Sequence, residues 1–188
     1  MNQLPPLFLS ILKFLVTLVI PLVLLMTAFR ILMTPGYVNL EYRMPGFPPD
    51  NYGFTQADRL KLAPIALNYL LNDKGIEFLG DLTFDDRTSL YNERELSHMV
   101  DVKNLVQVGL KVWLVLLIIL VGLGVWSWRG DWWGEYRLML ASGGKLTMFL
   151  IFAMILIVLV SFSQFFTVFH HIFFEGDTWI FLFSGKSR

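Results

Sequence analysis

Three long apolar runs divide this sequence and constrain its fold more than any other feature. They cover residues 7–33, 105–128 and 146–168. A helix needs roughly 20 mostly apolar residues to cross the hydrocarbon core of a bilayer, and each run is long enough. We therefore predict an all-α integral membrane protein with three transmembrane helices.

The composition agrees with a membrane protein. Hydrophobic residues make up 55% of the 188-residue chain and charged residues 16%, whereas a soluble domain carries about a quarter charged residues. Lys and Arg number 15, as do Asp and Glu, and no basic tract stands out, so nucleic acid is not an expected partner. The chain contains no cysteine, which excludes disulfides, a thiolate nucleophile and thiolate metal ligands.

The first run, 7–33, could be either a cleaved signal peptide or a retained helix. It has no Lys or Arg before its apolar part, it is too long for a signal peptide, and no clear cleavage site follows. Lys13 and Arg30 lie near its two ends, where long basic side chains can reach the interfaces, and Pro21 should kink the helix. We predict a retained transmembrane helix.

Residues 34–103 form a polar segment that we predict to be a mostly helical domain. Its beginning, rich in Pro, Gly and Tyr, is typical of an irregular loop or a short strand. Thr55 and Asp58 have the spacing of a capping box, so a helix should start there, bend at Pro64 and stop before Lys74. Asn92, followed by Glu95 three residues later, predicts another helix start.

The remaining segments are a connection, 129–145, and a C-terminal tail, 169–188. The connection carries Arg129, Arg137 and Lys145, and basic residues are enriched in short cytoplasmic loops. We therefore place the N-terminus and this connection in the cytoplasm of a multi-pass cell-membrane protein. The 34–103 domain and the tail then face the extracytoplasmic side.

Two histidine segments lie at the ends of the second and third apolar runs. His98 comes shortly before 105–128, and His170 comes directly after 146–168. If the two runs are consecutive antiparallel helices, both histidines emerge on the same membrane face, whichever way the protein is inserted. Two titratable groups brought together from distant positions indicate a reaction site.

Charged residues accompany the first histidine. Arg94, His98 and Asp101 recur at three- and four-residue spacing and share one helix face, and Glu95 is three residues before His98. A carboxylate one turn away could orient the imidazole and fix its tautomer, as a general base requires. The alternative is an ordinary polar helix end at the membrane surface.

The second histidine segment allows three interpretations, the first of which is a reaction site shared with His98. His170 is followed by His171, Glu175 and Asp177, and adjacent helical residues point about 100° apart, so only one of the two histidines can face His98. The segment could instead be an aromatic anchor at the interface. A zinc site is the other alternative, because histidines and carboxylates suit this metal, although the sequence has neither an HExxH motif nor other zinc-ligand spacing.

Around the histidines the sequence resembles a family of bacterial integral membrane proteins that includes the lipoprotein intramolecular transacylase. The resemblance rests on Arg94-Glu95-Leu96-Ser97-His98-Met99 with Asp101-Val102-Lys103, on Phe169-His170 with Ile172-Phe173-Phe174, and on the later Thr178-Trp179. The order of helices, outer domain and histidine segments also fits.

The resemblance implies a reaction and its site. The transacylase of that family moves the sn-2 acyl chain of a diacylglyceryl-cysteine lipoprotein to the α-amino group of the same cysteine. His98 and His170 match its functional histidines, whereas His171 does not. Membrane lipid and a lipoprotein are then the expected partners, without a cofactor or metal.

The number of spanning helices and a non-catalytic alternative also have to be considered. Members of the family usually continue into a fourth spanning helix after the second histidine segment, whereas this sequence ends at Arg188, so we expect three helices here. The alternative to an enzyme is a non-catalytic membrane protein that binds lipid or a partner protein through its 34–103 domain.

Overall fold

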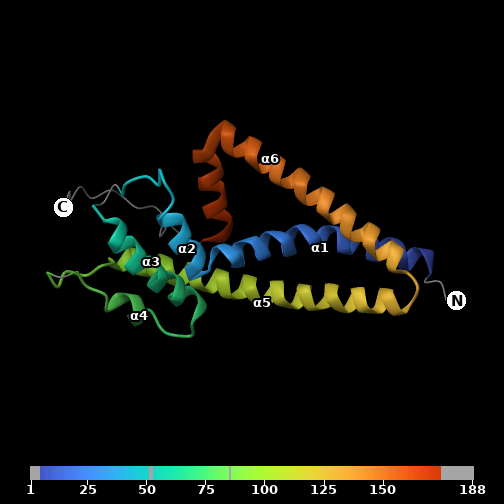
Figure 1. Ribbon diagram of the computed structural model, residues 1–188, viewed down its shortest axis with the longest axis horizontal. Coiled ribbons are helices and arrows are strands. Elements are labelled where there is room, and N and C mark those ends of the chain that lie inside the picture. The colour runs from blue at the N-terminus through green and yellow to red at the C-terminus, as the bar shows by residue number, and fades with distance from the viewer. Residues whose placement is uncertain (1–4, 51–52, 85, 175–188) are drawn as a thin grey trace. The chain divides into compact units, whose positions relative to one another are not determined.

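The computed structural model describes residues 5–50, 53–84 and 86–174, and most of these residues lie in helices (Figure 1). Three helices are long and apolar enough to cross a membrane, as predicted: α1 (Pro6–Leu32), α5 (Glu93–Arg129) and α6 (Trp133–Phe173). The others are α2 (Pro35–Tyr42), α3 (Gln56–Leu71) and α4 (Glu77–Gly80). Within the described residues, extended pairing is limited to one isolated bridge between Thr83 and Ser89.

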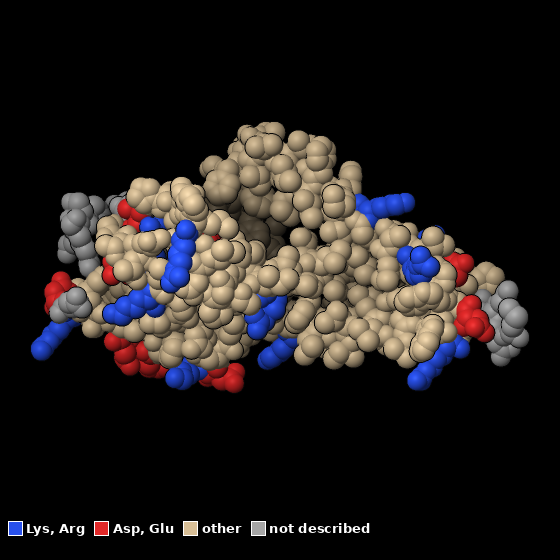
Figure 2. Space-filling view, in the orientation of Figure 1, with Lys and Arg blue, Asp and Glu red and all other residues tan. Residues whose placement is uncertain are grey.

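The residues fall into two compact units. The apolar unit contains the chain up to Phe29 and Gly109–Phe166, and the polar unit contains Arg30–Val108 and the residues from Thr167 onward. In the apolar unit, uncharged side chains cover most of the long helices (Figure 2). Many large apolar side chains on these helices are exposed, as expected for helices that are surrounded by lipid.

A small core joins the three helices of the apolar unit. Its buried residues are Val16, Ile20 and Val23 on α1, Leu120 on α5, Trp132 just before α6, and Tyr136 and Met139 on α6. Two polar side chains form hydrogen bonds with groups on a neighbouring helix. The Tyr136 hydroxyl donates to the Leu120 carbonyl at 2.7 Å, and the Trp113 indole N–H donates to the Thr27 hydroxyl at 3.0 Å.

Most of the predicted 129–145 connection between the second and third spans is helical. Only residues 130–132 are non-helical, and α6 begins at Trp133. Asp131 adopts a left-handed conformation, with φ of 59°, and short polar residues tolerate this conformation better than most. One left-handed residue next to a glycine is therefore enough to reverse the chain.

The third apolar run is interrupted rather than continuous. α6 extends beyond the predicted 146–168 at both ends, but Ser161 has the non-helical angles φ −158° and ψ 90°. The Gln164 backbone N–H donates to the Ser161 hydroxyl at 3.4 Å, as in an N-cap. α6 therefore consists of two helical parts, and the second part carries the second histidine segment (Figure 1).

In the polar unit, the prediction of an irregular loop or strand at the start of 34–103 was wrong for Pro35–Tyr42, which form α2. The Thr34 hydroxyl accepts a hydrogen bond from the Tyr37 N–H, and Pro35 occupies the first helical position. Both features favour helix initiation, and they outweigh the turn-forming composition of this stretch.

The two predicted helix starts in the polar unit are confirmed. Thr55 and Asp58 form a complete capping box at the start of α3, which passes through Pro64 and ends at Leu71. α3 is held to α5 by side chains from α5. The Lys103 ammonium donates to the Asn72 side chain at 3.2 Å and lies 4.2 Å from the centroid of the buried Tyr69 ring.

Candidate functional site

His98 lies in the charged first turns of α5, before the apolar part of this helix begins. The helix starts as predicted. The Glu95 carboxylate accepts from the Asn92 N–H at 2.8 Å, and the Asn92 side chain accepts from the Glu95 N–H at 2.9 Å. Glu95 thus closes a capping box, a role that requires its carboxylate to point away from the helix interior toward Asn92. His98, one turn later, is half-buried.

His170 lies in the last turn of α6, and within the polar unit it is a neighbour of His98. The two imidazole centroids are 6.4 Å apart, with an angle of 30° between the ring planes. The expected proximity of the two histidines is therefore confirmed. This separation is near the upper end of the 4.5–7 Å range of neighbouring aromatic rings. His171 is exposed, so His170 is the partner of His98.

Phenylalanine rings surround the histidine pair. Phe174 is buried, and its ring centroid lies 5.0 Å from that of His98 and 5.6 Å from that of His170. Phe169 packs on His170 nearly edge-on, at 5.4 Å and 73°. Phe169 and Phe174 belong to the motif on which the family resemblance rests, but the sequence assigned neither ring a role, because nothing in the spacing of this Phe-rich run distinguishes one ring from another.

The surroundings of His98 favour its neutral form. Burial lowers the pKa of His98 from its usual 6.5, the nearby His170 lowers it further, and the Asp101 carboxylate partly opposes both effects. A neutral imidazole keeps one nitrogen lone pair that can accept a proton. Asp101 and Arg94 are both half-buried on the same helix.

The zinc alternative finds no complete ligand set in the part of the chain that the structure describes. No group of three or more His, Asp or Glu side chains there is close enough to hold a metal ion. Glu175 and Asp177, two of the proposed ligands, lie outside the described residues. A pair of imidazoles alone falls short of the three or four protein ligands that zinc takes.

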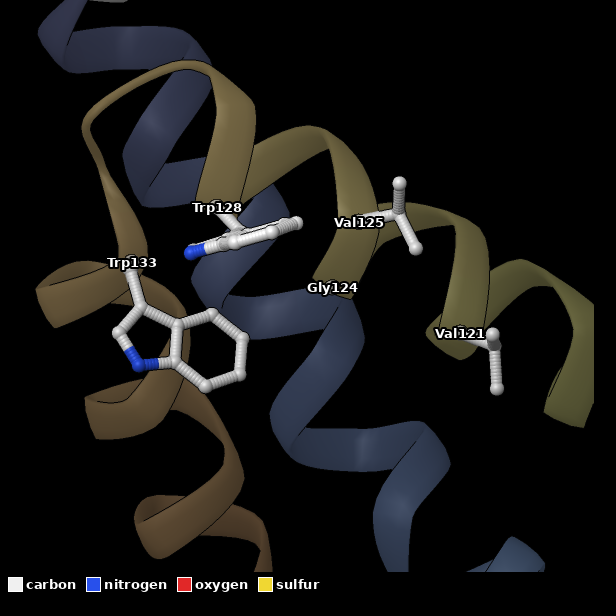
Figure 3. A pocket seen from close by; sticks show the side chains of 5 residues that line it. All are labelled: Val121, Gly124, Val125, Trp128 and Trp133. Atoms are coloured by element: carbon white, nitrogen blue, oxygen red, sulfur yellow. The ribbon is translucent and has the colours of Figure 1, made fainter.

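A separate pocket of about 450 Å³ lies in the apolar unit at the α5–α6 connection. Val121, Gly124, Val125, Trp128 and Trp133 line it, and the two indole rings lie next to each other across the connection (Figure 3). These lining side chains offer contact to apolar groups but contain neither a base nor a nucleophile. The histidine pair is therefore the better candidate for chemistry.

Comparison with known proteins supports the resemblance noted in the sequence. Residues 13–185 match the family described as lipoprotein intramolecular transacylase Lit. An uncharacterized protein from Aquifex aeolicus (strain VF5) is 27% identical over 175 residues, which are 93% of this chain and 78% of that relative. No solved structure is significantly similar. Because the match covers nearly the whole chain, this protein belongs to the lipoprotein intramolecular transacylase family.

Proposed function

We propose that this protein is a membrane acyltransferase. It would move the sn-2 acyl chain of a diacylglyceryl-cysteine lipoprotein to the α-amino group of the same cysteine. The observation that carries the proposal is the His98–His170 pair, with ring centroids 6.4 Å apart, in a chain that matches the transacylase family over residues 13–185. The catalytic residues are then His98 and His170, with Asp101, Arg94 and Glu95 in supporting positions.

The chemistry requires one proton acceptor and one proton donor. The α-ammonium group of the substrate, with a pKa near ~7.7–8, must lose a proton before its nitrogen attacks the ester carbonyl. The C–N bond forms, and the carbonyl oxygen carries negative charge. The nitrogen then loses a second proton, and the C–O bond to glycerol breaks to leave the amide. The leaving glyceryl oxygen takes up one of the two protons that the nitrogen gives up, and the other is released to solvent, so neither water nor a cofactor is consumed.

Two neighbouring histidines can divide these steps. A neutral imidazole accepts the ammonium proton, and a protonated one donates to the developing oxyanion or to the leaving oxygen. His98 is suited to the first role because its burial favours the neutral form and lowers its pKa. No covalent enzyme intermediate is needed, which agrees with a chain that contains no cysteine.

Positioning supplies much of the remaining catalysis, because donor and acceptor belong to one substrate molecule. The acyl chains would stay in the bilayer beside the exposed apolar side chains of the long helices, while the reacting head group reaches the histidines. We place the histidines and the polar unit on the extracytoplasmic side, since Arg129, Arg137 and Lys145 lie on the segment that joins the second and third spans.

The test is a reaction on a defined substrate. Purified protein in lipid is incubated with a synthetic diacylglyceryl lipopeptide that has a free amine and an isotopically labelled sn-2 chain. Because the total mass does not change, tandem mass spectrometry must locate the label. We expect the label on nitrogen with this substrate and on glycerol with an N-acetylated control. A folded protein that leaves the label on glycerol in both would contradict the proposal and favour a non-catalytic lipid- or partner-binding protein.

A further inference from the structure

Phe174 makes the closest ring contact of His98 among the described aromatic pairs. Its centroid lies 5.0 Å from that of His98 and 5.6 Å from that of His170, while the two imidazoles are 6.4 Å apart. The three rings thus form a compact triangle. Phe174 is only 8% exposed, although its neighbour Phe173 is 47% exposed.

The position of this ring follows from the end of α6. Phe174 is four residues after His170, and its backbone N–H donates to the His170 carbonyl at 2.8 Å. Residues four apart lie on the same side of a helix, so this last hydrogen bond brings the phenyl ring next to the His170 imidazole. His98 comes from a different helix, α5, and meets both rings from there.

We propose that Phe174 is a positioning residue, whose phenyl ring fixes the arrangement of the two imidazoles and excludes water from the side of the pair that it covers. This inference rests on the proposed function for its catalytic meaning, but the contacts themselves do not depend on the reaction. A substrate head group can then approach the imidazoles only from the sides that Phe174 leaves free.

The phenyl ring also affects protonation. A phenyl ring offers no hydrogen bond to an imidazolium, so covering His98 with it disfavours the charged form. Burial is indeed the largest cause of the lowered pKa of His98. Among the described residues, two titratable groups contribute to this shift: His170 on α6 lowers the pKa of His98 further, and Asp101 on α5 raises it.

The test is a titration of the histidines that needs no turnover. Full-length protein with labelled histidines is placed in lipid nanodiscs, and NMR follows the imidazole signals against pH, with His98→Gln used to assign the His98 signal. In Phe174→Ala, water reaches the pair, and we expect the pKa of His98 to rise toward 6.5. In Phe174→Leu, which stays apolar but covers less area, we expect a smaller rise.

Phe173→Ala is the matched control, because it removes an adjacent and exposed phenyl ring from the same turn. It should leave the pKa of His98 unchanged. If Phe174→Ala folds and the pKa of His98 does not move, the inference is overturned. If Phe174→Ala fails to fold, Phe174→Leu decides, and an unchanged pKa in that variant overturns it equally. Because no substrate is present, failure here is distinguishable from failure of the transacylase proposal.

Discussion

Gly143 on α6 is the position in the apolar unit where adding a single carbon atom should lower the stability most. A Cβ at this position would overlap the Ile20 Cβ and lie 2.8 Å and 2.9 Å from its Cγ1 and Cγ2 atoms. Carbon atoms prefer separations of about 3.5–4.0 Å, and Ile20 is a buried, branched residue of the core. Gly143→Ala must therefore push α1 and α6 apart.

The size of the effect follows from two opposing terms. Overpacking of this kind costs about 1–3 kcal/mol, and a buried contact with a branched carbon belongs in the upper half of this range. Replacing Gly by Ala within a helix returns about 1 kcal/mol. We expect Gly143→Ala to lower the free energy of unfolding by about 1–2 kcal/mol. Gly144→Ala, whose Cβ would meet nothing within 4 Å, should instead be neutral or stabilising.

Equilibrium unfolding in mixed detergent micelles, followed by the fluorescence of the 6 tryptophans, measures this difference. Ile20→Gly removes all three atoms that the new Cβ meets, so in that background Gly143→Ala should lose its penalty. If Gly143→Ala is as stable as Gly144→Ala in the wild-type background, α1 and α6 do not approach each other at Gly143, and the packing described for the apolar unit is incorrect.

Three further predictions concern the polar unit. Because the pKa of His98 is lowered by burial, the folded state binds fewer protons than the unfolded state near pH 6, and stability should fall as the pH drops below about 6.5. Unfolding of wild type and His98→Gln at about pH 7.5 and 5.5 checks this. An equal loss of stability in the two proteins on acidification would contradict the prediction. Lys103→Met removes the ammonium contacts to Asn72 and the Lys74 carbonyl and should cost about 1–3 kcal/mol in chemical unfolding. The exposed Lys111→Met should change stability by no more than about 0.5 kcal/mol, and equal effects of the two would refute the packing of Lys103. Thr55→Ala removes a helix cap and should cost about 1 kcal/mol, seen as faster hydrogen exchange in α3 but not in α5.

Helix starts and the histidine pair could be predicted because their causes are local or topological. Asn92 with Glu95 and Thr55 with Asp58 satisfy the first N–H groups of their own helices, so a few consecutive residues suffice. The proximity of His98 and His170 follows from their places at the ends of neighbouring apolar runs. Neither inference needs knowledge of side-chain packing.

Other features were missed although the sequence contained their signals. Thr34 followed by Pro35 is a helix start, but the later prolines and glycines dominated our interpretation of this stretch. Ser161 and Gln164 have the spacing of a capping box, whereas we predicted one continuous helix over 146–168. In both cases a local capping pattern prevailed over average composition.

The role of Phe174 could not have been inferred from the sequence, although the residue is part of the motif that carries the family resemblance. Phe173 is the last residue of α6 and Phe174 follows it, and the direction of the Phe174 ring depends on where α6 ends and on the ring of His98. The chain contains 17 phenylalanines, so residue type carries no information here. Such a contact depends on tertiary packing, which no local pattern encodes.

The most direct measurement compares the three histidines in the transfer reaction. Wild type, His98→Ala, His170→Ala and the matched control His171→Ala, whose side chain is exposed, are incubated with the labelled lipopeptide, and tandem mass spectrometry locates the sn-2 chain. We predict transfer to nitrogen by wild type and His171→Ala, with a loss of at least about 100-fold in each of the other two. Full transfer by folded His98→Ala or His170→Ala would contradict the proposal that this pair performs the reaction.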